Sequence, residues 1–158
     1  MEKKDVLKLA GCIILCLSAG LLGSIATAQS VSAWYVELNK PSFNPPNWVF
    51  GPIWTLLYLM MGTSLYLVLR NGFKDEEVKK GVAIFAVQLI LNTLWSFAFF
   101  GMKSPLAGIV VIIPLWLAIA LTIIQFKKTS EKAAYLLLPY LAWVSFATIL
   151  NLSITLLN

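Results

Sequence analysis

The side chains best suited to recognise a ligand are aromatic and amide groups that recur at helical spacing inside apolar stretches. In one stretch, Gln88, Asn92 and Trp95 fall at i, i+4 and i+7, and Ser96 and Phe99 continue the series at i+8 and i+11. These positions form one stripe of a helix. An amide that faced lipid would leave hydrogen-bonding groups unpaired, so the stripe is expected to face protein or a cavity. The spacing fits a ligand site and hydrogen-bonded helix contacts equally well.

Two other stretches repeat the combination of aromatic and polar or small residues along one helix face. Each begins with a tryptophan that has a partner four residues later. The residues are Trp54, Tyr58 and Met61 in one stretch and Trp143, Ala147 and Asn151 in the other. Together with the first stretch, they offer faces of aromatic and amide groups on three predicted helices.

Groups that support acid–base, nucleophilic or metal-dependent catalysis are scarce. The sequence has no histidine, which removes the commonest general base, metal ligand and axial haem ligand. Cys12 and Cys16 lie four residues apart in an apolar stretch and are interpreted as small hydrophobic side chains on one helix face. All seven acidic residues lie outside the apolar stretches, so we expect no intramembrane proton relay, no metal site and no conventional enzyme.

The composition determines which elements position these residues. Of 158 residues, 59% are apolar and only 12% charged, whereas soluble domains have about 45–50% apolar and about 25% charged residues. Five charge-free stretches of 20 to 25 residues each match the roughly 20 residues that a helix needs to cross a bilayer. They predict an all-α, polytopic membrane protein. Residues 1–158 would form a single domain, a bundle of five transmembrane helices at about 9–28, 48–69, 81–102, 105–126 and 133–157.

The first stretch has a second interpretation. The charged segment before it and Ala26-Thr27-Ala28 at its end resemble a signal peptide, but its 20 apolar residues exceed the usual length of about 7–15. We therefore expect a retained transmembrane helix. Small residues form two ridges on it, which predict close packing within the bundle or contact in a homodimer. The ridges are Ala19, Gly23 and Thr27, and Gly20, Ser24 and Ala28.

The basic residues predict the orientation. Ten of the twelve fall on the side of the N-terminus and the second and fourth loops, and only Lys40 and Lys103 fall on the other side. The positive-inside rule then places the N-terminus in the cytoplasm and the first loop and Asn158 outside the cell membrane. Contact with lipid headgroups explains the net charge of +5 better than nucleic acid does.

The first loop, residues 29–47, is the longest and is rich in proline and aromatic residues. We expect it to order as a lid over one mouth of the bundle, although a rigid connector is an equally simple account. Prolines inside the predicted spans are expected to bend their helices. They are Pro52, Pro114 and Pro139.

Several short motifs follow one another along nearly the whole chain. They are Trp34-Tyr35, Lys40-Pro41-Ser42 and Pro45-Pro46; Trp48 to Pro52, Trp54, Leu57-Tyr58 and Met61-Gly62; Gln88, Leu91-Asn92, Trp95 and Phe99-Phe100-Gly101; and Pro139 to Trp143, Phe146-Ala147 and Leu150-Asn151. In these motifs and their order the sequence resembles the TspO/translocator-protein family, also called tryptophan-rich sensory proteins or peripheral-type benzodiazepine receptors.

The resemblance implies a membrane receptor or sensor that binds tetrapyrroles such as protoporphyrin IX in an aromatic pocket opening toward the first loop. No cofactor is required. The free-base porphyrin would be the ligand, held by ring stacking and by loop donors such as Lys40 on its propionates. Trp54 and Trp143 match tryptophans implicated in light-dependent porphyrin breakdown in some bacterial relatives. The implied ligand-binding residues are Tyr35, Pro45, Trp54, Tyr58, Gln88, Asn92, Trp95, Trp143, Phe146, Ala147 and Asn151.

One motif of the animal relatives, which also bind cholesterol and benzodiazepine-type drugs, is missing here. Their cholesterol motif needs an aromatic and then a basic residue after the position of Asn151, where this chain continues as Leu-Ser-Ile-Thr-Leu-Leu-Asn. Sterol recognition by that motif is therefore not expected. A transporter of porphyrins or other apolar ligands and a structural membrane scaffold are the alternative functions.

Overall fold

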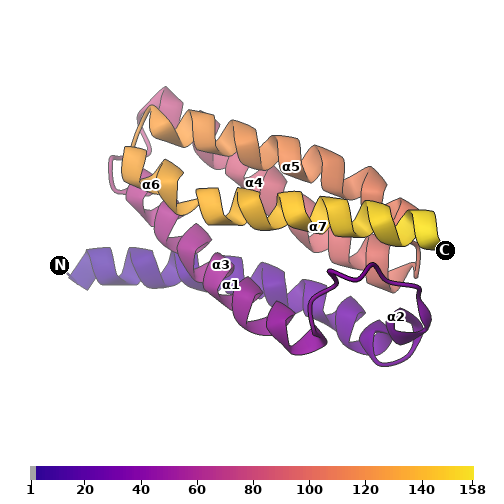
Figure 1. Ribbon diagram of the computed structural model, residues 1–158. Helices are drawn as coiled ribbons and strands as arrows, with labels where there is room; N and C mark the ends of the chain where they lie inside the picture. The colour runs from indigo at the N-terminus through magenta and orange to yellow at the C-terminus, as the bar shows by residue number, and fades with distance from the viewer. Residues whose placement is uncertain (1–2) are drawn as a thin grey trace.

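The computed structural model describes residues 3–158, and within them all regular structure is helical (Figure 1). Long runs of apolar residues form the helices, and short polar segments connect them. The elements are α1 (Lys3–Val31), α2 (Trp34–Glu37), α3 (Asn47–Leu69), α4 (Glu76–Ser96), the π-helix η1 (Phe97–Gly101), α5 (Pro105–Lys127), α6 (Glu131–Leu136) and α7 (Leu138–Leu157).

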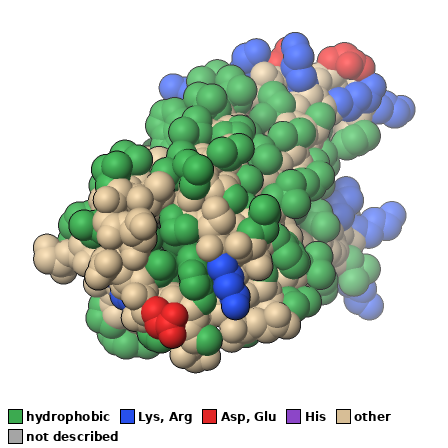
Figure 2. Space-filling model, turned by 90° about the vertical axis from the view of Figure 1, so that its right-hand side faces the viewer, with side chains coloured by type: hydrophobic (Ala, Val, Ile, Leu, Met, Phe, Trp, Pro, Cys, Tyr) green, Lys and Arg blue, Asp and Glu red, His purple; other side chains and the backbone are tan. Residues whose placement is uncertain are grey.

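Five helical segments of the described chain are long and apolar enough to span a membrane: α1, α3, α4 with η1, α5, and α6 with α7. This confirms the expected bundle of five spans in an integral membrane protein. Large apolar side chains remain exposed on the outside of each span, for example Leu21, Leu117 and Ile149. Figure 2 shows such side chains over much of the surface. In hydrocarbon this exposure has no cost, because lipid tails are as apolar as leucine.

The helices pack so that α4 contacts α1 and α5, α5 also contacts α7, and α1 crosses α3 (Figure 1). The crossing is close because Gly62 of α3 lies against the backbone of α1. A Cβ atom at Gly62 would lie 2.6 Å from the Cα atom of Ile13. Cys12 and Cys16 lie buried on this side of α1 as free thiols, which confirms that they are small core residues.

Two of the predicted spans are not uniform α-helices. The span expected at 133–157 is present, and Leu137 divides it into α6 and α7 close to Pro139, where a bend was expected. Pro139 lies in the first turn of α7, where its missing N–H and ring are tolerated, whereas a helix running through it would lose a hydrogen bond. The third span changes to a π-helix at Phe97. Such wide turns inside helices are often found at functional sites.

The segment 32–46, which joins α1 to α3 and contains α2, is here called the lid. It folds over one end of the bundle, beside the end of α7 (Figure 1). Figure 2 looks at this end and shows few charged side chains on it, while most blue and red side chains gather at the far end. The first loop is thus ordered over the bundle mouth, as expected of a lid.

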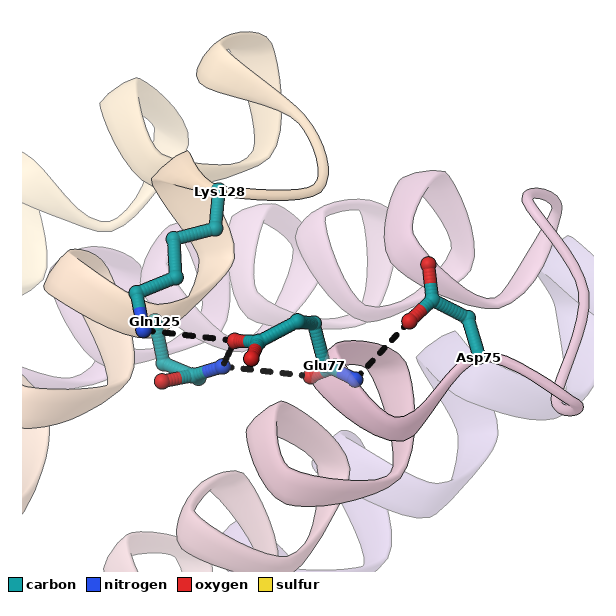
Figure 3. A network of polar contacts seen from close by, with 4 residues as sticks. All are labelled: Asp75, Glu77, Gln125 and Lys128. Carbon is teal, nitrogen blue, oxygen red and sulfur yellow. Dashed lines mark hydrogen bonds and ion pairs between the residues drawn. The ribbon is translucent and has the colours of Figure 1, made fainter.

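At the opposite end, a polar network joins the start of α4 to the end of α5 (Figure 3). The Asp75 carboxylate accepts a hydrogen bond of 2.9 Å from the backbone N–H of Glu77 and so caps α4. The Glu77 carboxylate accepts hydrogen bonds from Gln125 and, at 3.2 Å, from Lys128. Because both side chains are exposed to solvent, the ion pair contributes little to stability. It lies outside the apolar part of the bundle.

The close crossing of α1 and α3 predicts that Gly62→Ala destabilises the protein. The added methyl group meets backbone atoms that cannot rotate away, and overpacking of this kind typically costs about 1–3 kcal/mol. Thermal unfolding in detergent or nanodiscs measures the effect. Gly51→Ala, in the same helix but with no atom within 4 Å of the new methyl group, is the control. Equal melting temperatures for the two variants would contradict the packing described.

Candidate functional site

A cavity of about 570 Å³ lies inside the bundle below the lid. Its wall is formed by α1, α3, α4, η1 and α7, and α2 contributes Tyr35 at the lid end. The volume falls within the range of roughly 300–1,000 Å³ that is usual for small-molecule sites. Part of the wall is formed by exposed residues such as Leu21, Ser24 and Thr55, so the cavity also opens sideways between α1 and α3.

Eight of the residues that the sequence suggested for ligand binding come together in this wall, although they derive from four separate segments of the chain. They are Tyr35, Trp54, Tyr58, Asn92, Trp95, Trp143, Ala147 and Asn151. The predicted stripe on α4 continues into η1, and its members Ser96 and Phe99 also line the cavity. Met61, by contrast, is completely buried in the core.

Three other suggested residues do not line the cavity. Gln88 is buried one helical turn below Asn92 and contacts Tyr140. Phe146 faces a shallow groove between α3 and α7 on the outside of the bundle. Pro45 lies in the lid, where its carbonyl accepts a hydrogen bond from Asn44. Any effect of these residues on a ligand would act through their neighbours.

The floor of the cavity is a chain of buried hydrogen bonds across three helices. Tyr58 of α3 donates to the side-chain oxygen of Asn92 in α4. The Asn92 amide nitrogen donates to the Tyr140 hydroxyl of α7 at 3.0 Å, and Tyr140 donates to the Gln88 oxygen at 2.9 Å. All four side chains are at least 90% buried. The amides of the α4 stripe therefore join helices, and Asn92 also forms part of the pocket wall.

A second amide connects the upper wall. Asn151 of α7 accepts a hydrogen bond from the indole nitrogen of Trp95 at 3.2 Å and donates to the carbonyl of Pro105 at 2.8 Å. Gly108 leaves room for this amide, because a Cβ atom there would lie 2.6 Å from its oxygen. Asn151 thus fixes the position of the Trp95 ring.

Pairs of aromatic rings fix the other walls. Trp54 stacks on Tyr58 with 5.7 Å between ring centroids, and Trp95 stacks on Phe99 at 5.5 Å. Trp143 contacts Phe50 at 5.9 Å. Within the described residues, the buried indole nitrogen of Trp143 has no hydrogen-bond partner. Each pair adds roughly 0.5–1.5 kcal/mol beyond area burial, so these rings are held in place before any ligand binds.

The face of α1 that lines the cavity was not predicted as part of the site. Its residues Gly20, Ser24 and Ala28 belong to one of the small-residue ridges, and Thr27 lines the cavity beside them. A Cβ atom at Gly20 would lie 2.4 Å from the Tyr58 ring, so the missing side chain of Gly20 leaves room for this ring at the floor of the cavity. In the other ridge, Gly23 packs within the bundle, where a Cβ atom would lie 2.9 Å from the Ser96 hydroxyl oxygen. The spacing of the ridges was a signal for close packing but not for a cavity.

The lid is stabilised by its own polar contacts. Tyr35 is 4% exposed and donates a hydrogen bond of 2.8 Å to Asn44, and burial raises the pKa of its hydroxyl to about 12. The Lys40 ammonium donates to the carbonyls of Tyr35, Val36 and Leu38 and lies 4.9 Å from the Tyr35 ring centroid. All three N–H groups of Lys40 are therefore engaged within the lid.

The electrostatics of the pocket are those of a neutral site. Among the described residues, no Lys, Arg, Asp or Glu side chain lines the cavity. Within the same part of the chain, no cluster of three His, Cys, Asp or Glu side chains is positioned to hold a metal ion. The wall offers ring faces, small side chains and hydroxyl groups, which suit stacking on a flat apolar molecule.

The fold and cavity define a class of protein: a helical membrane protein with an uncharged, tryptophan-lined pocket beneath a loop. The sequence profile of the TspO/MBR family matches residues 12–157, and the chain belongs to this family, as its motifs predicted. It is 54% identical over 155 residues to the tryptophan-rich protein TspO of Chlorobaculum tepidum, covering 98% of both chains.

Two further relatives show how widely the similarity extends. The chain is 52% identical over 155 residues to the tryptophan-rich protein TspO of Archaeoglobus fulgidus, covering 98% of this chain and 99% of that one. It is 41% identical over 120 residues to the human translocator protein, covering 75% of this chain and 70% of that protein. The matches to these three proteins thus each cover at least 75% of this chain.

The hydrogen-bond chain at the floor predicts that Tyr140→Phe destabilises the bundle. Without this hydroxyl, the Asn92 amide nitrogen and the Gln88 oxygen lose a hydrogen-bond partner although both side chains are buried, which costs about 1–3 kcal/mol. Tyr135→Phe, which removes an exposed hydroxyl from the same span, is the control. A fall in melting temperature is expected for Tyr140→Phe only, and equal values would refute the role assigned to the chain.

Proposed function

We propose that the protein is a membrane receptor or sensor that binds a tetrapyrrole such as protoporphyrin IX in this cavity. The observation that carries the proposal is the combination of Trp54, Trp95 and Trp143 in the wall of one uncharged cavity of about 570 Å³. A flat, largely apolar ring can stack on such walls. Membership of the TspO/MBR family supports the same ligand class.

The structure suggests how the ligand's carboxylates are accommodated. Sequence reasoning assigned them to Lys40, but that ammonium already donates to three lid carbonyls. Polar residues that both line the cavity and are exposed, such as Ser32 and Asn47, lie where the lid joins α1 and α3. We propose that the macrocycle lies in the apolar part of the cavity and that its propionates point toward this polar end and water, where charge is least costly.

The arrangement of the rings favours a second candidate, light-dependent oxidative breakdown of the bound porphyrin with dioxygen as the oxidant. Trp54 lines the cavity, stacks on Tyr58, and contacts the Tyr140 ring edge-on at 6.2 Å. Trp54 and Trp143 would be the oxidisable side chains that contact the ligand. Under this proposal, bleaching of bound porphyrin requires light and is slower in the Trp54→Phe and Trp143→Phe variants than in the wild type.

The proposed orientation follows the distribution of charge. The lid end carries Lys40 and Lys103, whereas the other basic residues lie at or near the opposite end of the spans. We propose that the lid faces outward and the N-terminus lies in the cytoplasm of the cell, since basic residues are retained on the cytoplasmic side.

Titration of the purified protein with protoporphyrin IX tests ligand binding. We expect saturable quenching of tryptophan fluorescence and a weaker affinity when Trp54 and Trp143 are both replaced by phenylalanine, by about fivefold to a hundredfold if roughly 1–3 kcal/mol of stacking and contact is lost. Trp116→Phe is the control, because Trp116 hydrogen-bonds Ser145 between α5 and α7 and does not line the cavity. Unsaturable quenching, identical in all variants, would rule out the proposed site.

A further inference from the structure

The lid is attached to the bundle at two separate places. At the first place, Tyr35 of the lid packs against the rings of Phe99 and Phe100, and Ser30 in the last turn of α1, just before the lid, donates its hydroxyl to the carbonyl of Phe100 at 2.7 Å. These contacts join the lid to η1. They lie close to the end of α1, so they hold one side of the lid only.

The second attachment is to α7. There the Phe43 ring of the lid packs edge-on against Phe146 with 6.2 Å between ring centroids, and Asn158 hydrogen-bonds the lid backbone. The Asn158 side-chain oxygen accepts a hydrogen bond of 3.0 Å from the backbone N–H of Asn39, and its nitrogen donates to the Asn39 carbonyl at 2.9 Å. One amide thus pairs with both backbone groups of a lid residue, as a neighbouring β-strand would. The Asn39 side chain adds a hydrogen bond of 3.3 Å to the carbonyl of Leu157.

This attachment lies directly beside the end of the cavity. Tyr35 and Leu38 of the lid pack into one apolar cluster with Leu150 and Ile154 of α7. Tyr35, Leu150 and Ile154 also line the cavity, so this cluster closes its lid end. Asn158 follows Ile154 by one helical turn and donates a further hydrogen bond of 2.8 Å to its carbonyl.

We propose that Asn158 is a positioning residue that holds the lid closed over the cavity, and that release of its pair with Asn39 is a step in ligand exchange. The inference rests on the proposed function for its ligand but not for the lid contact itself. The contacts of Lys40 with three carbonyls keep the segment around α2 compact, so the lid opens as a unit when its α7 side is released. Asn158 does not line the cavity. Removal of its side chain is therefore expected to change the rates at which the ligand binds and dissociates more than the ligand's affinity.

Two measurements on the full chain in nanodiscs test the proposal. Hydrogen exchange of the lid amides, including that of Asn39, reports opening without any ligand. Stopped-flow mixing with protoporphyrin IX, and displacement from the complex, report the association and dissociation rates. The variants are Asn158→Ala, which loses all three side-chain hydrogen bonds, and Asn39→Ala, which keeps both backbone contacts. Ser153→Ala is the control, because that hydroxyl bonds only within α7.

For Asn158→Ala we expect faster hydrogen exchange of the lid amides. Association and dissociation of protoporphyrin IX should both be about tenfold faster, and its dissociation constant should change by less than about threefold. Asn39→Ala should have a smaller effect, and Ser153→Ala none. Hydrogen exchange of the lid amides equal to that of the control would overturn the proposal. So would faster hydrogen exchange with unchanged rates of ligand association and dissociation, because the ligand would then enter between α1 and α3. If the wild type shows no saturable binding, the proposed function fails, while the exchange data still decide whether Asn158 closes the lid.

Discussion

Hydrogen bonding between neutral side chains inside the bilayer is the constraint on which the rest of this structure depends. An amide in hydrocarbon must find partners within the protein, because neither lipid nor water supplies them. Asn92 meets this requirement by joining Tyr58 of α3 to Tyr140 of α7. Asn151 does the same for Trp95 and the start of α5. These contacts fix how far apart α3, α4 and α7 lie, and so define the floor and one wall of the cavity.

The same constraint explains why the cavity is uncharged. A charge in this position would need a buried partner, whereas Tyr58, Asn92 and Tyr140 hydrogen-bond one another without ions. Trp54 stacks on Tyr58, which hydrogen-bonds Asn92. Phe99 stacks on Trp95, which hydrogen-bonds Asn151. A neutral, preorganised aromatic site in a membrane is suited to a ligand that partitions into lipid, which is consistent with the tetrapyrrole class proposed.

Much of this architecture could be predicted from the sequence, because the bilayer imposes simple rules of length and polarity. The five spans follow from apolar runs, and the stripe containing Asn92 follows from helical periodicity. Other features depend on contacts between distant segments and leave no local signal. The pairing of Asn158 with Asn39 is one such feature, and the wall contributed by Gly20 is another. Pro139 predicted a bend in the last span, but the sequence did not show that a new helix, α7, would begin at Leu138 with Pro139 in its first turn.

The spacing of Gln88 also shows the limit of periodicity. It lies on the same stripe as Asn92, but the stripe extends below the cavity, and there Gln88 contacts Tyr140 instead. Residues on one helix face thus divide between a binding wall and the helix contacts beneath it. The cavity ends at Tyr58 and Asn92, and Gln88 lies one helical turn beneath them.

We propose that a flat ligand binds inside the bundle, against walls that are already in place. A crystal structure of the protein with protoporphyrin IX tests it most directly. We expect a macrocycle within the cavity, in contact with Trp54 and Trp143, while the hydrogen bonds of Asn92 stay as they are in the free protein. A macrocycle bound on the outer surface, for example against the exposed ring of Trp48, would contradict it.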